Sequence, residues 1–334
     1  MDVLQKIHIR KVTASTAIQE SHKRPFLEAR ARTVRAVRAR FDARGFTEVD
    51  PPCVVPCPTM DVHVHGFAVP EAGGFLHCSP EFHMKQLLAA GWERIYALGP
   101  VWRREVAGPW HAPEFTMLEW YRVHEDYQTL IQDCKDILCA VSQTFFTQDL
   151  ACDPNGTWEI ITVAQAFERY VDIDLSSCLN DTPRLAAAAR NRNVRVADGD
   201  GWDDIFHAVM AQHIEPRLGS PAPTVLTHYP AHMAALARLA PGDPRWAERA
   251  ELYICGMEVA NGFSELTNPE EQRARFVADA AEKHRLYGFS YTPDEAFLAA
   301  LESGMPESAG MALGLDRLVM LATGAEHIGQ VRWG

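Results

Sequence analysis

The sequence predicts an α+β protein built on one antiparallel sheet with helices packed against it. Segments with the pattern of a strand are separated by stretches of unequal length rather than by regular helical crossovers, which favours an antiparallel sheet over a doubly wound one. The 334 residues are 47% hydrophobic and 23% charged, as in ordinary globular proteins. No apolar run approaches the roughly 18 residues that a membrane-spanning helix needs, so we expect no membrane insertion.

The expected elements follow in chain order. Residues 1–24 are polar and weakly patterned, which indicates an N-terminal arm. A helix is predicted over 25–44, because apolar residues such as Phe26, Val37 and Phe41 recur at helical spacing. Gly45 ends this helix, and a short strand then runs into two prolines that stop it. The remaining expected elements are a strand near 75–77, a helix near 81–90, strands at 94–103 and 115–123, a helical insertion at about 127–218, strands at 223–230 and 249–263, a helix near 269–286, and a strand followed by a helix at 310–324.

The charge balance and the cysteines restrict the possible partners and the compartment. Lys plus Arg number 32 and Asp plus Glu 44, which gives a formal charge of -12. Proteins that bind nucleic acid usually carry a basic face, so a nucleic-acid partner would need positive evidence. Eight cysteines in a chain of this length, behind an N-terminus without the apolar core of a secretory signal, indicate reduced thiols and a cytoplasmic protein.

Three segments together carry a family resemblance, although each is weak alone. They are FTEVDPP (46–52), VWRREVAGPWHAPEFTMLEWYR (101–122) and GMALGLDRLVML (310–321). In this order and at these separations they resemble motifs 1, 2 and 3 of the class II aminoacyl-tRNA synthetases. SPEFHMKQLL (79–88) and ELYICGMEVANGFSEL (251–266) resemble the lysyl branch of that family. The resemblance implies a class II catalytic domain over 25–334, with an antiparallel sheet flanked by helices.

One difference from the lysyl-tRNA synthetases bears on the acceptor. Those enzymes carry an N-terminal OB-fold that reads the anticodon, whereas motif 1 here begins within the first 50 residues. This arrangement is similar to the stand-alone paralogues that ligate lysine or β-lysine onto elongation factor P. The acidic charge agrees, because a protein acceptor needs no general phosphate-binding face. The resemblance therefore implies elongation factor P as acceptor, no anticodon recognition, no tRNA partner, and a homodimer formed through motif 1.

The resemblance also implies ATP and Mg²⁺ as cofactors. The substrate carboxylate attacks the α-phosphate of ATP, so catalysis depends on positioning and on stabilising phosphoryl charge. Arg103 is expected to bridge the α-phosphate and the substrate carboxylate, a role suited to a planar bidentate cation. Glu251 and Glu258 are expected to hold Mg²⁺ through oxygen ligands. The expected catalytic residues are Arg103 and Arg317, and the expected ATP-binding residues are Arg103, Glu105, His111, Phe115, Glu251, Leu252, Gly314 and Arg317. Within this set Glu105 would accept from the adenine amino group, His111 would approach the outer phosphates, and Phe115 and Arg317 would enclose adenine.

The expected amino-acid pocket is rich in acidic residues. An ammonium group taken from water must meet carboxylates or lose several kcal/mol. By resemblance, Glu265 and Tyr121 would hold the ε-ammonium of lysine, and Glu81 would face the other amino group. The expected substrate-binding residues are Ser79, Glu81, Glu119, Tyr121, Glu258, Asn261, Phe263, Glu265 and Ala312, with Asn261 at the carboxylate end and Phe263 on the aliphatic stem.

Three positions set this sequence apart within the resemblance. Ala312 stands where lysyl-tRNA synthetases usually have glycine and the elongation factor P ligases have alanine. One methyl group discriminates by about 1–3 kcal/mol, which favours β-lysine without excluding α-lysine. Arg104 and Ala112 stand where asparagine is usual in this branch, so the rate or the affinity could differ from the family's norm.

Three alternative functions remain open at this point. A small-molecule ligase of asparagine synthetase A type would need a cation facing the aspartate side chain. A truncated synthetase that charges tRNA would need a basic surface that acts without the anticodon. A catalytically silent regulatory paralogue finds support only in Arg104 and Ala112, and retention of Arg103 and Arg317 argues against it.

Overall fold

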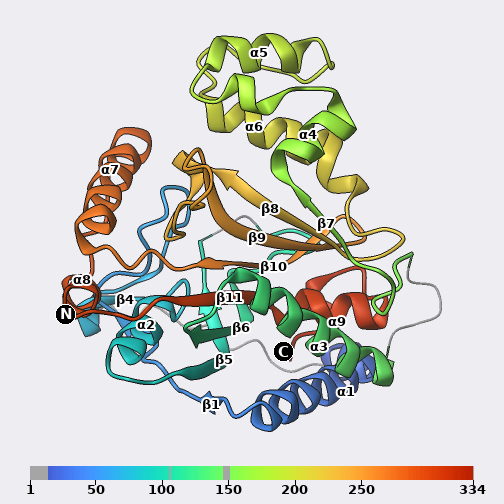
Figure 1. The fold of residues 1–334 in the computed structure, drawn as a ribbon. Helices are drawn as coiled ribbons and strands as arrows, with labels where there is room; N and C mark the ends of the chain where they lie inside the picture. The colour runs from blue at the N-terminus through green and yellow to red at the C-terminus, as the bar shows by residue number, and fades with distance from the viewer. Residues whose placement is uncertain (1–13, 105–106, 146–150, 334) are drawn as a thin grey trace, which may run out of the picture.

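A computed structural model describes residues 14–104, 107–145 and 151–333, and their main feature is one mixed sheet (Figure 1). The central strand pairs of this sheet are antiparallel, as predicted, while β1 pairs with β5 and β7 with β8 in parallel at the two edges. A small antiparallel sheet has the order β2–β4–β3. In sheet order, the large sheet consists of β1 (Thr47–Glu48), β5 (Arg94–Trp102), β6 (Glu114–Val123), β11 (Ser308–Gly314), β10 (Met257–Ser264), β9 (Trp246–Ile254), β8 (Thr224–Pro230) and β7 (Glu159–Thr162); the small sheet consists of β2 (Val54–Val55), β4 (Gly74–Leu76) and β3 (Ala68–Val69).

Three helices cover one face of the large sheet (Figure 1). They are α1 (Ala14–Ala43), α3 (Tyr127–Phe145) and α9 (Leu315–Thr323), and they share a core with the sheet in which Val37, Leu118 and Leu318 are fully buried. The helix predicted at 25–44 begins earlier, at Ala14, so Pro25 lies inside it and residues 14–24 of the expected arm are helical. Proline is well suited to the first turn of a helix, which is why the sequence pattern placed the start at Pro25.

Three further helices lie close to the small sheet (Figure 1). They are α2 (Glu81–Ala89), α7 (Pro269–Tyr287) and α8 (Glu295–Glu302), and their second core includes Phe82, Phe276 and Phe297. The Phe82 and Phe297 rings stack with centroids 4.9 Å apart, which joins α2 to α8. This core supports the loops and strands that carry the expected amino-acid pocket.

The predicted helical insertion at 127–218 has two parts in the structure. Helix α3 packs on the large sheet, whereas α4 (Val163–Val171), α5 (Thr182–Arg190) and α6 (Trp202–Val209) form a separate core beside β7 and β8 (Figure 1). Phe206 stacks between Phe167 and Trp202 in that core, with ring centroids 5.1 and 5.3 Å away. The short helical segments of the chain are η1 (Pro70–Ala72), η2 (Leu175–Cys178), η3 (Met210–Ile214), η4 (Glu215–Arg217), η5 (Ala231–Met233) and η6 (Ile328–Gln330). None of the helices in the described part of the chain has the length and apolar composition that a bilayer crossing requires.

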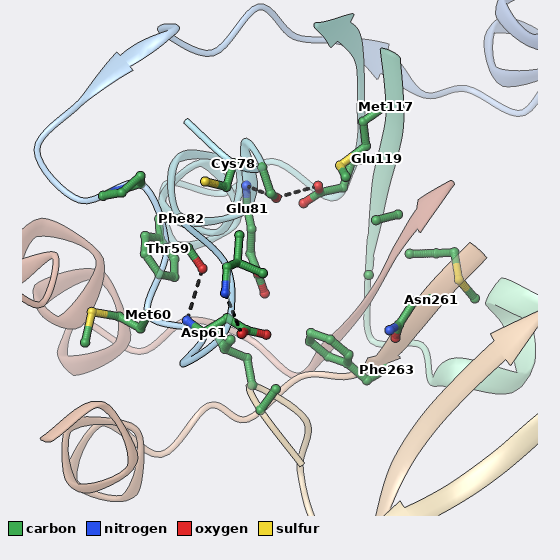
Figure 2. Close-up of a pocket in the computed structure, with 18 of the residues that line it drawn as sticks. Thr59, Met60, Asp61, Cys78, Glu81, Phe82, Met117, Glu119, Asn261 and Phe263 are labelled. Carbon is green, nitrogen blue, oxygen red and sulfur yellow. Dashed lines mark hydrogen bonds between the residues drawn. The ribbon is translucent and has the colours of Figure 1, made fainter. Parts of the chain in front are cut away.

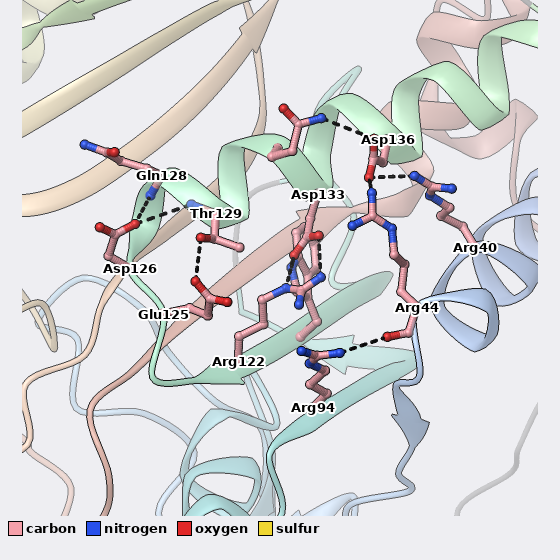
Figure 3. A network of polar contacts seen from close by, with 12 residues as sticks. Arg40, Arg44, Arg94, Arg122, Glu125, Asp126, Gln128, Thr129, Asp133 and Asp136 are labelled. Carbon is pink, nitrogen blue, oxygen red and sulfur yellow. Dashed lines mark hydrogen bonds and ion pairs between the residues drawn. The ribbon is translucent and has the colours of Figure 1, made fainter.

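One buried ion pair holds α3 to the sheet, and partly exposed ion pairs join α3 to α1 (Figure 3). Arg122 on β6 donates to both carboxylate oxygens of Asp133 on α3, at 2.6 and 2.7 Å, and both side chains are buried. Asp136, one turn further along α3, pairs with Arg40 at 2.6 Å and with Arg44. Helix α3 is therefore held to β6, and the end of α1 is held to α3, on the face of the sheet that the helices cover.

Candidate active site

Strand alternation decides which side chains reach the open face of the large sheet. Along β6, Leu118 and Trp120 pack into the core under the helices, so Glu119 and Tyr121 point to the opposite face. The neighbouring β11 follows the same rule and is paired so that Ala312 lies opposite Glu119. Two adjoining cavities lie on this face.

The first cavity has a volume of about 220 Å³, and we call it the acidic cavity. Four acidic residues line it: Asp61, Glu81, Glu119 and Asp279. Figure 2 shows Glu81 and Glu119 on one side of the space and Asn261 and Phe263 of β10 on the other. Seven of the predicted substrate-binding residues line this cavity, together with Arg103: Ser79, Glu81, Glu119, Tyr121, Asn261, Phe263 and Ala312.

The second cavity has a volume of about 280 Å³, and we call it the arginine cavity. The predicted ATP-binding residues Arg103, His111, Phe115, Gly314 and Arg317 all line it. Four residues line both cavities, namely Arg103, Met117, Asn261 and Ala312. The two spaces therefore meet at an arginine, an amide and the methyl group of Ala312.

Hydrogen bonds organise the deep end of the acidic cavity. The hydroxyls of Ser79 and Tyr121 each donate to the Glu119 carboxylate at 2.7 Å. Burial and the negative charge of Glu81 raise the pKa of Glu119 to about 7, while the two hydroxyl donors oppose that rise. Glu119 is thus an acid that changes charge near neutral pH, and a bound cation would stabilise its ionised form.

Lys85 is a functional candidate that is not among the residues predicted from the sequence. Its ammonium is 1% exposed, lies 2.6 Å from Glu81 and forms an ion pair with Glu265. It also lies 5.2 Å from the centroid of the Phe263 ring. The signal that could have found it is its position one helical turn after Glu81, where opposite charges meet on one helix face.

Glu265 lies behind the cavity wall rather than in it. Its side chain is fully buried, and it lines neither cavity. Gly310, which lines the cavity, lies directly against it, since a Cβ at that position would lie 2.7 Å from Glu265 Oε1 and 2.2 Å from the Tyr121 ring. The glycine therefore brings the backbone close to both side chains, and Glu265 already has a cationic partner in Lys85.

The side chains of the arginine cavity contact one another. Arg317 donates from Nη1 to the carbonyl of Glu258 at 2.8 Å, and its Nη2 lies 2.8 Å from His111 Nε2. Arg103 donates to the carbonyl of Cys78 at 3.3 Å, and its guanidinium lies 5.3 Å from the centroid of Phe115. Cationic groups and an aromatic face thus line one space, which suits a nucleotide with its phosphates.

The predicted metal ligands lie on adjacent strands. Glu251 on β9 is 6% exposed and accepts from Arg249 at 2.7 Å, Tyr253 at 2.8 Å and Asn261 at 3.2 Å. Glu258 on β10 lines the arginine cavity with 39% of its side chain exposed, and loss of hydration and the charge of Glu251 raise its pKa. The described residues hold no cluster of three or more acidic, His or Cys ligands. Of the two carboxylates, Glu258 lines the arginine cavity and fits Mg²⁺ that keeps phosphate and water ligands, whereas Glu251 lines neither cavity.

Three predicted residues need separate mention. Leu252 is 2% exposed and packs in the core under the sheet, so its side chain reaches neither cavity. Glu105 lies outside the described residues. The Nδ2 of Asn261 donates to Glu251, which leaves its Oδ1, an acceptor without a partner among the described residues, at the junction of the cavities.

The lining also includes residues that the sequence pattern did not assign. Asp279 on α7 faces the acidic cavity, and burial together with the charge of Asp61 raises its pKa to about 6. Arg249 lines the same cavity and pairs with Glu251. Their place in the site depends on how α7 and β9 pack in the folded chain, which no local sequence pattern predicts.

Comparison with known proteins gives a consistent result. The family model for tRNA synthetases class II (D, K and N) matches residues 7–333. The chain is 40% identical over 323 residues to "Elongation factor P--(R)-beta-lysine ligase" of Klebsiella pneumoniae (strain 342), covering 94% of this chain and 95% of that protein. A protein of the same name from Haemophilus influenzae (strain PittGG) is 38% identical over 310 residues, covering 90% of this chain and 92% of that protein. Another, from Vibrio cholerae serotype O1, is 40% identical over 315 residues, covering 91% of this chain and 93% of that protein.

Proposed function

This chain belongs to the class II tRNA synthetases (D, K and N) and is an ATP-dependent ligase, and on this premise we propose its substrates and reaction. It activates (R)-β-lysine, or lysine, as an aminoacyl adenylate and transfers the acyl group to a lysine side chain of elongation factor P. The observation that carries the proposal is that Arg103 lines both cavities, so one guanidinium can reach an α-phosphate and a substrate carboxylate.

The first step forms the adenylate. A carboxylate oxygen of the amino acid attacks the α-phosphorus, and the bond to pyrophosphate breaks. Arg103 brings the two anionic groups together and stabilises the charge that develops between them, while Arg317 and Phe115 enclose the base. Mg²⁺ held by Glu251 and Glu258 would supply positive charge to the phosphates.

The second step transfers the acyl group. The amine of the acceptor lysine attacks the carbonyl carbon of the adenylate, the bond from that carbon to the AMP oxygen breaks, and the amine loses a proton. No side chain of this chain acts as a nucleophile. Because the reaction centre lies where the two cavities meet, the acceptor lysine side chain must reach this junction from outside. We further propose that the enzyme acts as a homodimer in the cytoplasm.

The acidic cavity supports a substrate with two amino groups. Glu81 and Glu119 line it, Glu265 lies just behind Gly310, and Phe263 offers an apolar surface to the aliphatic stem. An asparagine synthetase A type of ligase would need a cation for a second substrate carboxylate. Two cations beside this cavity already form ion pairs, Lys85 with Glu81 and Glu265, and Arg249 with Glu251. Ala312 at the junction supports β-lysine over α-lysine.

The experiment that tests the proposal is amino-acid-dependent ATP–pyrophosphate exchange with α-lysine, (R)-β-lysine and aspartate. We expect exchange to be strongest with (R)-β-lysine, and we expect incubation with ATP and elongation factor P to add the mass of one β-lysyl group to that protein. Arg103→Gln should abolish exchange, while the matched change Arg332→Gln should not. Exchange with aspartate alone would contradict the assignment of the acidic cavity, and no exchange with any substrate would favour a silent paralogue.

A further inference from the structure

The buried ammonium of Lys85 lies beside the proposed amino-acid pocket and has no assigned role in the reaction. We propose that Lys85 is the counter-ion that makes the acidic cavity selective for diamino acids, because it pairs with both Glu81 and Glu265 and holds these carboxylates where they can bind a distal ammonium group. The inference rests on the proposed function and deepens it, since it names a specificity-determining residue. Lys85 acts through the two acids and is not required to touch the reacting atoms.

The contacts of Lys85 hold it in one place. Its side chain is 1% exposed, and its ammonium lies 2.6 Å from Glu81 of α2 and pairs with Glu265 beyond β10. The rings of Phe263 and Phe297 lie 5.2 and 5.7 Å from the ammonium and complete an enclosure without further charge. A cation placed in this way cannot leave the acids for solvent.

Burial would otherwise neutralise the acids that the proposed substrate needs. Burial raises the pKa of the Glu265 carboxyl, and the adjacent Lys85 ammonium opposes this rise by its charge and its contact. Burial lowers the pKa of Lys85, but Glu265 and Glu81 outweigh it and raise that pKa above its ordinary value. The ammonium therefore stays charged at neutral pH, and it favours the ionised form of its partners.

The same arrangement leaves a place for the substrate. Lys85 pairs with Glu265 through Oε2, and Oε1 has no hydrogen-bond partner among the described residues although the side chain is fully buried. Oε1 lies beside Gly310, which lines the acidic cavity. A buried acceptor without a partner calls for a donor that the described residues do not supply, such as a water molecule or a ligand, and a substrate ammonium is such a donor.

The other ionisable groups that line the acidic cavity include Glu119 and Tyr121 on β6, Asp61, Asp279 on α7, Arg103, and Arg249 on β9. Glu119 lies in the cavity with a carboxyl group that titrates near neutral pH, and Tyr121 donates to it. Without Lys85, Glu81 and Glu265 would lose the cation that pairs with both of them, and protonation of Glu119 or Glu265 would relieve the repulsion among the three acids. The expected consequence is a weaker hold on the distal ammonium, which worsens as the pH falls.

The test compares Lys85→Met with the charge-retaining control Lys85→Arg and the wild type. The readout is KM in ATP–pyrophosphate exchange from pH 6 to 9, with two substrate pairs: (R)-β-lysine against 3-aminohexanoic acid, and lysine against norleucine. For Lys85→Met we expect KM for the diamino acids to rise by at least about tenfold while KM for the monoamino acids changes little. We also expect the pH at the midpoint of the fall in KM for the diamino acids to increase by about one unit. Lys85→Arg should keep most of the preference.

Two results would overturn the proposal. A lower KM for diamino acids in Lys85→Met would mean that Lys85 competes with the substrate for its acids, and an equal rise for both substrate classes would mean a structural role only. If Lys85→Met does not fold, the double variant Lys85→Gln, Glu265→Gln replaces the ion pair by a neutral pair. A retained preference for diamino acids in that variant would contradict the proposal. Absence of exchange in the wild type would refute the proposed function itself, and calorimetric binding of lysine and norleucine would still decide the role of Lys85.

Discussion

Arg30 of α1 offers the sharpest test of how the fold supports the arginine cavity. Its guanidinium pairs with Asp316 of α9 and donates to Thr116 Oγ1 at 2.5 Å and to the carbonyl of Val331 at 3.2 Å. Asp316 in turn accepts from the Thr116 amide at 2.7 Å, directly beside Phe115. The side chains of Arg30 and Asp316 are only 9% and 2% exposed, so this pair links three elements out of contact with solvent.

We expect Arg30→Met to lower the free energy of unfolding by about 3–5 kcal/mol, because it leaves the Asp316 carboxylate buried without its cation. Urea denaturation measures this quantity, and Arg24→Met is the matched control on the same helix. The Arg24 side chain is 78% exposed and pairs with the exposed Glu28, so its loss should have no measurable effect. A loss below about 1 kcal/mol in Arg30→Met would refute the reasoning, since a buried carboxylate would then tolerate isolation.

Three further predictions concern the cavities. Arg317→Gln should raise KM for ATP by about tenfold or more without changing KM for the amino acid, because it removes a charge-assisted contact to the nucleotide; Arg332→Gln serves as the control, and an unchanged KM for ATP would contradict the assignment. Amino-acid affinity should increase as the pH rises through about 7, because the raised pKa of Glu119 leaves it neutral below that value. Ser79→Ala, which removes a donor to that carboxylate, should move the midpoint of the KM–pH profile upward, and a downward movement would count against the reasoning. Ala312→Gly should shift the ratio of kcat/KM toward α-lysine by about tenfold, within the 1–3 kcal/mol that one methyl group contributes; an unchanged ratio would show that this position does not select the substrate.

Much of the fold follows from local patterns in the sequence. Alternation at 94–103 and 115–123 predicts β5 and β6, and the predicted terminal strand and helix match β11 and α9. The start of α1 was predicted too late, because Pro25 has the sequence signature of a first turn while the helix continues through it. The division of 127–218 between the main core and a separate core also depends on packing, since an apolar stripe does not reveal which surface it will cover.

The candidate site divides in the same way. Residues on one strand face could be grouped in advance, because the period of a strand puts Glu119 and Tyr121 on one side. The register between β6 and β11, which places Ala312 opposite Glu119 at the junction of the cavities, is a property of the sheet. The orphaned Oδ1 of Asn261 also emerges only in three dimensions, since it depends on which way the amide donates.

The sequence by itself determined the antiparallel sheet, the family motifs and the types of residue available for chemistry, because these depend on local spacing and composition. Only the tertiary structure decided which charges neutralise one another. Glu265 lies far along the chain from Lys85 and Glu81, and its ion pair with Lys85 forms only when α2 packs against the end of β10. Coulomb energy depends on distance and burial rather than on sequence order, so the charge balance of the pocket is set by the fold.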